Sequence, residues 1–252
     1  MASSASSVET PATRTGSADS SASRIKKGVA PLRAGQGSSF FWRRLHSLSG
    51  IVPIGAFLIE HFVSNSESMN GVQAYNDQVK FLTSLPFVHV LEWVFIFIPL
   101  IYHGLYGLYI WYRGDANVKE YPWSGNWMYT AQRWTGIIAF IYIAYHVIDM
   151  RFMGVHLMGG GYNNAFSKVW FDFQSPWVVA FYVIGIIAAS WHFAYGIWLF
   201  AAKWGFTVGD KARRKFGYVC LAIGLVMVGM GLWSVSGFLR TPAQQVPYVE
   251  HH

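Results

Sequence analysis

Five apolar stretches, each more than about 20 residues long, are separated by polar segments along the chain. They cover residues 42–63, 87–112, 127–150, 176–202 and 216–239. A helix rises about 1.5 Å per residue, so about 20 apolar residues cross the hydrocarbon core of a bilayer. The pattern therefore predicts an all-α fold, an integral membrane bundle of five transmembrane helices.

The polar segments divide the chain into three parts. Residues 1–37 are rich in Ser, Ala, Thr and Gly with a basic end, and they have no apolar period that could bury a face. We therefore expect a disordered N-terminal tail, a five-helix membrane domain over 38–240 and a C-terminal tail over 241–252. Within the domain, residues 72–82 predict a short amphipathic helix, residues 151–175 a Gly-rich connection, and Pro99 a bend in the second span.

Composition supports a membrane protein and excludes other classes. Hydrophobic residues make up 53% of the chain and charged residues 12%, which is too apolar for an ordinary soluble domain. The net charge of +7 does not indicate nucleic acid as a partner, because the basic residues flank apolar spans and form no continuous stripe. The single cysteine, Cys220, allows neither a disulfide framework nor a thiolate metal cluster within the chain.

The basic residues also predict the orientation. Of the 19 lysines and arginines, all but Lys80, Arg151, Lys168 and Arg240 fall on the side that holds the N-terminus. Positive residues are retained on the cytoplasmic side of a membrane, or on the matrix side in an organelle. We therefore expect a multi-pass protein of the cytoplasmic membrane with a cytoplasmic N-terminus, and we call that side inner and the opposite side outer.

Four histidines lie inside the predicted spans, where an ionisable side chain is costly without a partner. His61 and His146 lie about 19 residues from the inner ends of their spans, whereas His103 and His192 lie about 9 to 11 residues from them. The histidines thus form two pairs at levels roughly 13 Å apart, and each pair joins two spans. His103 and His192 also share the motif H-x-x-Y-G, in which a glycine one turn later leaves room for a flat group such as a porphyrin.

Two imidazoles facing each other suit the iron of a haem. The pairing assigns His103 and His192 to an inner haem b, and His61 and His146 to an outer one. Bis-imidazole ligation fills both axial positions, so such haems carry electrons instead of binding oxygen or substrate. The alternative is that these histidines relay protons or form hydrogen bonds between helices.

Basic side chains near the two haem levels are candidates for contacting haem propionates. His46 and Arg44 lie near the inner interface, and Arg151 lies at the outer one. Glu60 and Asp149 are the acidic residues closest to the outer level. A carboxylate there is placed to pass on a proton from the nearby aqueous side.

Several motifs together resemble the dihaem cytochrome b558 membrane anchor of succinate:quinone oxidoreductase, the family of succinate dehydrogenase and fumarate reductase. They are R-R-L-H-S-L-S-G at 43–50, F-L-I-E-H at 57–61, L-I-Y-H-G-L-Y-G at 100–107, N-W-M-Y-T-A-Q-R-W-T-G-I at 126–137 and H-F-A-Y-G at 192–196. The likeness covers about residues 38–240, everything except the tails.

The resemblance implies a non-flavin subunit that transfers electrons and reduces quinone, with no succinate active site of its own. In that family a flavoprotein subunit with FAD oxidises succinate, an iron-sulfur subunit passes the electrons on, and two haems b carry them to menaquinone. His103 and His192 would hold the haem nearer the iron-sulfur subunit, and His61 and His146 the distal one. Some fumarate-reducing relatives have a glutamate two residues before the fourth ligand; Ser190 stands there in this chain, which favours succinate oxidation.

Two other functions remain open at this point. One is a dihaem quinol-oxidising anchor of another respiratory enzyme, such as a fumarate reductase, nitrate reductase or hydrogenase, which would have a different soluble partner. The other is a proton-coupled transporter, which would usually show broken helices around a midplane binding site. Two bis-histidine haems in the purified protein would support either dihaem anchor, and no haem would support the transporter.

Overall fold

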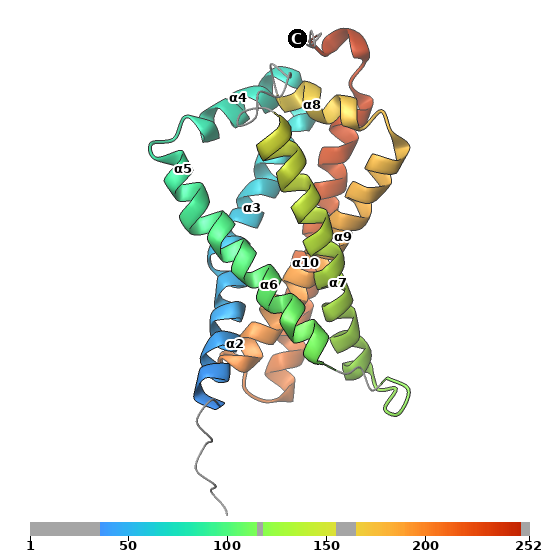
Figure 1. Cartoon of the computed structure of the whole chain (residues 1–252). Helices are drawn as coiled ribbons and strands as arrows, with labels where there is room; N and C mark the ends of the chain where they lie inside the picture. Colours follow the sequence, from blue (N-terminus) through green and yellow to red (C-terminus); the bar gives the residue numbers. More distant parts are fainter. Residues whose placement is uncertain (1–35, 115–117, 155–164, 248–252) are drawn as a thin grey trace, which may run out of the picture. The chain divides into compact units, whose positions relative to one another are not determined.

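The computed structural model describes residues 36–114, 118–154 and 165–247, and every regular element in those ranges is helical (Figure 1). Among them, five helical segments are long and apolar enough to cross a bilayer: Ser39–Asn70, Val88–Arg113, Ser124–Met153, Pro176–Lys203 and Asp210–Arg240. The predicted all-α fold with five spans is confirmed. Most of the expected N-terminal tail and the last five residues lie outside the described ranges.

The chain divides into two compact units, residues up to Trp42 and residues from Arg43 onward. The first span consists of α2 (Gln36–Ile51) and α3 (Pro53–Asn65), and it continues as the 3₁₀ helix η1 (Ser66–Asn70). Pro53 starts α3 and has no N–H to continue the ladder of α2, so the helix is interrupted there. The span ends at Gly71, whose φ of 100° is readily reached only by glycine.

The second and third spans both contain a π-helical segment at their outer ends. The second consists of α5 (Val88–Leu91), the π-helix η2 (Glu92–Phe97) and α6 (Ile98–Arg113). Pro99 lies in the first turn of α6 and follows a π-helical segment, so the regular α-helix is interrupted just before the proline, while the bend itself stays a prediction. The third span is α7 (Ser124–Val147) continued by the π-helix η3 (Ile148–Gly154).

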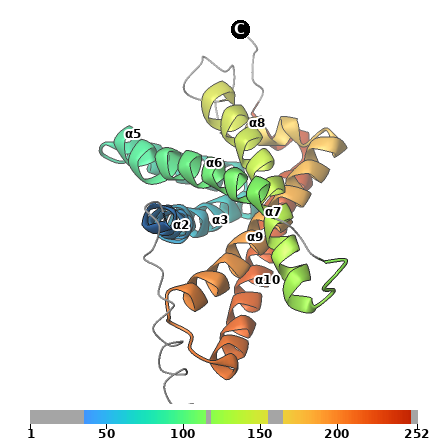
Figure 2. The ribbon, with the colours of Figure 1, turned by 60° about the horizontal axis from the view of Figure 1, so that its bottom comes forward.

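The fourth span, α9 (Pro176–Lys203), is the most enclosed helix of the bundle and packs against α7 and α10 (Asp210–Arg240). In turn α3 packs against α10, and α6 contacts both α3 and α7 (Figure 2). Of the residues in the apolar stretch of α9, 44% are buried, whereas only 6% of those in the second span are buried. On α6 the exposed side chains Ile101, Leu105 and Tyr109 follow one another at four-residue intervals, which is the pattern of a face turned toward lipid.

Two short helices and η1 cover the outer ends of the spans (Figure 1). They are α4 (Val72–Thr83), which matches the predicted amphipathic helix, and α8 (Ala165–Asp172), which the Gly-rich connection did not predict. Phe166 of α8 is fully buried, and its ring contacts those of Tyr75 and Phe238 at centroid distances of 5.8 Å and 4.8 Å. After α10, the 3₁₀ helix η4 (Ala243–Gln245) ends the described chain.

Gly237 permits the closest helix contact in this outer region. A Cβ there would stand 2.7 Å from the backbone carbon and oxygen of Ser68, whose hydroxyl donates to the carbonyl of Ser234 at 2.8 Å. Since backbone cannot rotate away, we expect Gly237→Ala to destabilise the fold by about 1–3 kcal/mol. Gly229→Ala on the same helix is the control, because nothing lies within 4 Å of its Cβ. Equal thermal unfolding midpoints in detergent for the two variants would contradict this prediction.

Candidate functional site

The structure brings the four intramembrane histidines together in two pairs. His61 of α3 faces His146 of α7 with ring centres 5.6 Å apart and planes at 68°. His103 of α6 faces His192 of α9 with ring centres 6.1 Å apart and planes at 84°. These are the pairs that depth along the spans predicts, and each joins two helices that are distant in sequence.

Hydrogen bonds fix the imidazoles of the inner pair. The Nδ1 of His103 donates to the carbonyl of His46 at 2.9 Å, and the Nδ1 of His192 donates to the carbonyl of Gln132 at 3.0 Å. A carbonyl only accepts, so both Nδ1 atoms carry the proton. Both Nε2 atoms therefore keep a free lone pair, which is the tautomer that a metal-binding histidine needs.

The outer pair has side-chain partners instead. The Nδ1 of His146 lies 3.2 Å from the hydroxyl of Tyr182 on α9. Beside His61, the amide nitrogen of Asn65 lies 3.3 Å from Nδ1 and 3.4 Å from Nε2, while it donates to the carbonyl of His61 at 2.8 Å. Tyr75 of α4 donates to the amide oxygen of Asn65 at 3.1 Å, so the helices covering the outer end help to hold this side chain.

The separation of the two imidazoles in each pair is compatible with a metal between them. A metal about 2 Å from one nitrogen of each imidazole places the two ring centres about 6 Å apart, close to both observed separations. Bare structural zinc sites use four protein ligands, and no group of three or more His, Cys, Asp or Glu residues in the described ranges is placed to hold a bare ion. A haem needs only the two axial ligands that each pair supplies.

Glycines let the inner imidazoles approach neighbouring backbones. A Cβ on Gly136 of α7 would stand 2.8 Å from Cε1 of His192, and a Cβ on Gly50 of α2 would collide with the ring of His103. The glycines of the repeated motif border polar side chains: a Cβ on Gly107 would lie 3.3 Å from Nε2 of His46, and one on Gly196 would lie 3.7 Å from the amide nitrogen of Gln132.

The three candidates for propionate contacts lie in different surroundings. The ring of His46 stacks on that of His103, with centroids 4.1 Å apart and planes at 8°. The guanidinium of Arg44 lies over the ring of Trp204, 5.0 Å from its centroid. Arg151 donates twice to the carboxylate of Glu92, at 3.0 Å and 2.7 Å. Of the three, His46 alone has a described contact with a site histidine, and the propionate roles stay predictions.

Sequence reasoning missed the residues that orient the histidines. The backbone carbonyl of Gln132 accepts from Nδ1 of His192, and the side-chain amide of Gln132 donates to the backbone carbonyl of His192 at 2.9 Å. These two hydrogen bonds join α7 to α9. The sequence signal that could have identified Gln132 is its place in the motif at 126–137. Asn65 stands four residues after His61, on the same helix face, whereas the position of Tyr182 depends on how α9 is turned toward α7.

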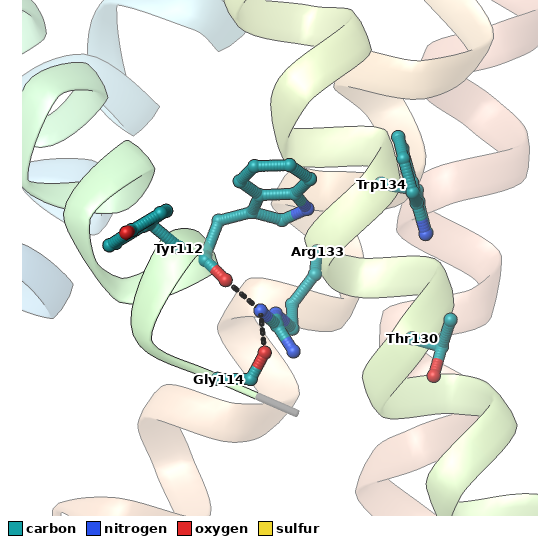
Figure 3. Close-up of a pocket in the computed structure, with 6 residues that line it drawn as sticks. Tyr112, Gly114, Thr130, Arg133 and Trp134 are labelled. Atoms are coloured by element: carbon teal, nitrogen blue, oxygen red, sulfur yellow. Dashed lines mark hydrogen bonds between the residues drawn. The ribbon is translucent and has the colours of Figure 1, made fainter. Parts of the chain in front are cut away.

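The inner end also contains a cavity of about 280 Å³ between α6 and α7 (Figure 3). It is lined by Trp111, Tyr112, Gly114, Thr130, Arg133 and Trp134. The guanidinium of Arg133 reaches across to donate to the carbonyls of Trp111 and Gly114, the second at 2.6 Å. A cation at this point pairs with the carbonyl of Gly114 and adds a second donor to that of Trp111, which also accepts from the backbone N–H of Gly114 at 3.3 Å.

We expect Arg133→Met to destabilise the fold by about 1–3 kcal/mol, because it removes the donor that Arg133 supplies to the carbonyl of Gly114 and the positive charge at the end of α6. Lys119→Met makes the same charge change at an exposed side chain at this end of the bundle, and we expect it to have little effect. Thermal unfolding of both variants in the same detergent measures the difference. A midpoint for Arg133→Met equal to that of Lys119→Met would show that Arg133 does not stabilise the end of α6.

The fold and the paired histidines define a class, that of all-helical, multi-pass membrane proteins with histidines facing each other between spans. Residues 117–231 match the family model described as succinate dehydrogenase/fumarate reductase transmembrane subunit. Over 200 residues the chain is 39% identical to the succinate dehydrogenase cytochrome b558 subunit of Bacillus subtilis (strain 168), covering 79% of this chain and 97% of that protein. The chain therefore belongs to the family of succinate dehydrogenase membrane-anchor cytochrome b subunits, which confirms the resemblance carried by its motifs.

Proposed function

We propose that this chain is the anchor of a succinate:menaquinone oxidoreductase and holds two haems b, one between His103 and His192 and one between His61 and His146. The observation that carries the proposal is that each pair joins facing helices at a separation suited to axial ligation. The name of the relative, a cytochrome b558 subunit, supports haem b as the cofactor. A bis-histidine haem alternates between ferric and ferrous iron, and so carries one electron at a time.

The protein's part is to orient the ligands and to exclude water. The carbonyls of His46 and Gln132 keep the inner imidazoles in the tautomer that leaves Nε2 free. The hydroxyl of Tyr182 bonds to Nδ1 of His146 and so orients the imidazole ring. The covering helices α4 and α8 bury the outer ends of the spans, so side chains control how protons reach the outer pair.

In this proposal electrons enter at the inner end and leave at the outer end. A flavoprotein subunit with FAD and an iron-sulfur subunit supply them, and the iron-sulfur subunit docks on the basic inner surface, formed by Arg43, Arg44, Arg113 and residues 211–215. The N-terminus is cytoplasmic in this orientation. Menaquinone is reduced beside the outer pair. Ser190 is fully buried and supplies no carboxylate, which supports succinate oxidation as the working direction.

Haem content and its reduction by succinate test this function. The complex purified with its partner subunits should contain two haems b per chain, both low-spin and both reduced when succinate is added. One haem or none would overturn the proposal, and no haem would favour the transporter. Two haems that succinate leaves oxidised would favour an anchor of another respiratory enzyme. In sealed vesicles an uncoupler should slow turnover to menaquinone, because electrons would move outward against a potential that is negative inside.

Tyr182→Phe tests the assigned orientation of His146. Removing the hydroxyl frees one side of the imidazole, and losing such a partner typically weakens metal binding about 10–100-fold. We expect a lower content of the outer haem and an altered electron paramagnetic resonance signal for it, while the inner haem is unchanged. Tyr145→Phe is the matched control, because that exposed ring packs on Phe181. An outer signal identical to wild type in both variants would remove Tyr182 from this role.

A further inference from the structure

A cluster of three charged side chains lies close to the outer histidine pair: Lys168 is buried, whereas the side chains of Asp149 and Asp172 are half-buried, at 21% and 18% exposed. The ammonium of Lys168 on α8 stands 2.9 Å from both carboxylate oxygens of Asp149 on η3 and 2.6 Å from one oxygen of Asp172 on α8. Lys168 is only 5% exposed. Among the described residues, one ammonium faces two carboxylates, so these three groups together carry one surplus negative charge unless a proton neutralises it.

The surplus charge makes proton binding at the carboxylates favourable. Burial raises the pKa of Asp172 to about 6; Lys168 opposes this shift and the carboxylate of Asp149 adds to it. Burial alone would lower the pKa of Lys168, but its hydrogen bonds to Asp172 and Asp149 outweigh this and raise that pKa. Lys168 therefore stays charged, and the group that exchanges a proton near neutral pH is Asp172.

The cluster is linked to the outer pair through two packed elements. Asp149 follows His146 by three residues, on the continuation of α7 into η3. Phe173, next to Asp172, packs on the ring of Tyr182 at a centroid distance of 5.0 Å, and the hydroxyl of Tyr182 lies 3.2 Å from His146. A charge change at the outer pair therefore occurs beside the cluster, in a region of low dielectric where charges act strongly on each other.

We propose that the Lys168–Asp149–Asp172 cluster takes up one proton when an electron reaches the outer haem and releases it when the electron leaves. This inference rests on the proposed function, which places a haem between His61 and His146. When an electron arrives at a haem held between His61 and His146, one proton from the outer aqueous phase would neutralise Asp172. The net charge of the region would then be unchanged, and the proton would leave again when the electron passes on to quinone.

The charged groups that act on Asp172 are Lys168 on its own helix and Asp149 on η3. Tyr145 on α7 and Tyr182 on α9 lie within electrostatic range of both carboxylates. The helices α4 and α10 also pack on α8, and from α4 it is the neutral phenol of Tyr75 that contacts Phe166. Among the described residues, these side chains of α7, α9 and α4 are therefore neutral, and Lys168 is the cation that the two carboxylates contact.

A redox titration of the intact complex tests the proposal. Proton uptake on reduction makes the midpoint potential of the outer haem fall with rising pH, by up to about 59 mV for each tenfold fall in proton concentration. We expect this slope between about pH 6 and pH 8. The inner haem, titrated in the same sample, should show a weaker slope and serves as an internal reference.

Asp172→Asn should abolish the slope of the outer haem, because one ammonium then faces one carboxylate. Asp149→Asn makes the same charge change on η3 and should do the same. Asp77→Asn on α4 is the control: its carboxylate is exposed and bonds to Gln73 at 2.9 Å, and the slope should persist. Two haems with a pH-independent outer potential in the wild type, or a full slope in both cluster variants, would overturn this inference alone. A wild type without two haems would overturn the proposed function.

Discussion

Replacing any one of the four paired histidines by alanine is expected to reduce the complex from two haems to one. His103→Ala and His192→Ala should remove the inner haem, and His61→Ala and His146→Ala the outer one, because each iron loses half of its axial ligation. Haem content per chain and the reduced-minus-oxidised absorbance spectrum measure the loss. All four variants should also abolish electron transfer from succinate to menaquinone, since the path needs both haems.

His46→Ala is the control for these variants. His46 stacks on His103, but its contribution to orienting that ring is its backbone carbonyl, which alanine retains. Both irons should therefore remain ligated, with a small shift of the inner haem spectrum from the lost stacking. Loss of a haem in His46→Ala while His61→Ala keeps two would show that the pairing is wrong.

The five spans were predictable because a bilayer selects on length and apolarity, which can be read directly from the chain. Hydrocarbon offers no partners for backbone groups, so a long apolar run in a helical protein must be a helix. The amphipathic helix at 72–82 was predictable for a related reason, since its apolar positions recur at helical spacing. Both features are properties of local sequence.

Departures from regular α-helix were only partly predictable. Pro99 signals a disturbance, but it does not predict that the disturbance takes the form of six π-helical residues, Glu92–Phe97, before it. Pro53 carries the same signal in the first span, and the apolar run around it concealed the break between α2 and α3. Residues Ala165–Asp172 are too few to stand out in a Gly-rich connection, and they form a helix because Phe166 is buried between α4 and α10.

Depth along a helix predicts which histidines can meet, since each residue advances about 1.5 Å. It does not predict what holds their second nitrogen, because that depends on how each helix is rotated about its own axis. Gln132 and Tyr182 are brought to His192 and His146 by such rotations. Lys168 was counted among the four outer cations as a topology signal, whereas the structure buries it against Asp149 and Asp172.

Lys168→Met is expected to be the most destabilising single change at the outer end of the bundle. It leaves the half-buried carboxylates of Asp149 and Asp172 together without a cation. Breaking a fully buried ion pair typically costs about 3–5 kcal/mol, and partial exposure of the carboxylates should reduce this cost. Thermal unfolding of the purified chain in detergent at pH 7.5 measures the loss. Lys80→Met on α4 removes the same charge from an exposed position and should leave the midpoint nearly unchanged.

The pH dependence separates loss of the cation from loss of packing. Because burial raises the pKa of Asp172 to about 6, the folded wild type binds more protons than the unfolded chain between about pH 4 and pH 6. Ionised Asp172 therefore opposes folding, and this opposition grows as pH rises through that range. Without Lys168 both carboxyls should need protons to stay buried, so the defect of Lys168→Met should be large at pH 7.5 and smaller at pH 5.

A further variant that combines Lys168→Met with Asp149→Asn and Asp172→Asn should recover much of the loss at pH 7.5, because no buried charge remains. Equal defects at both pH values, with no recovery in the combined variant, would mean that Lys168 stabilises α8 by packing alone.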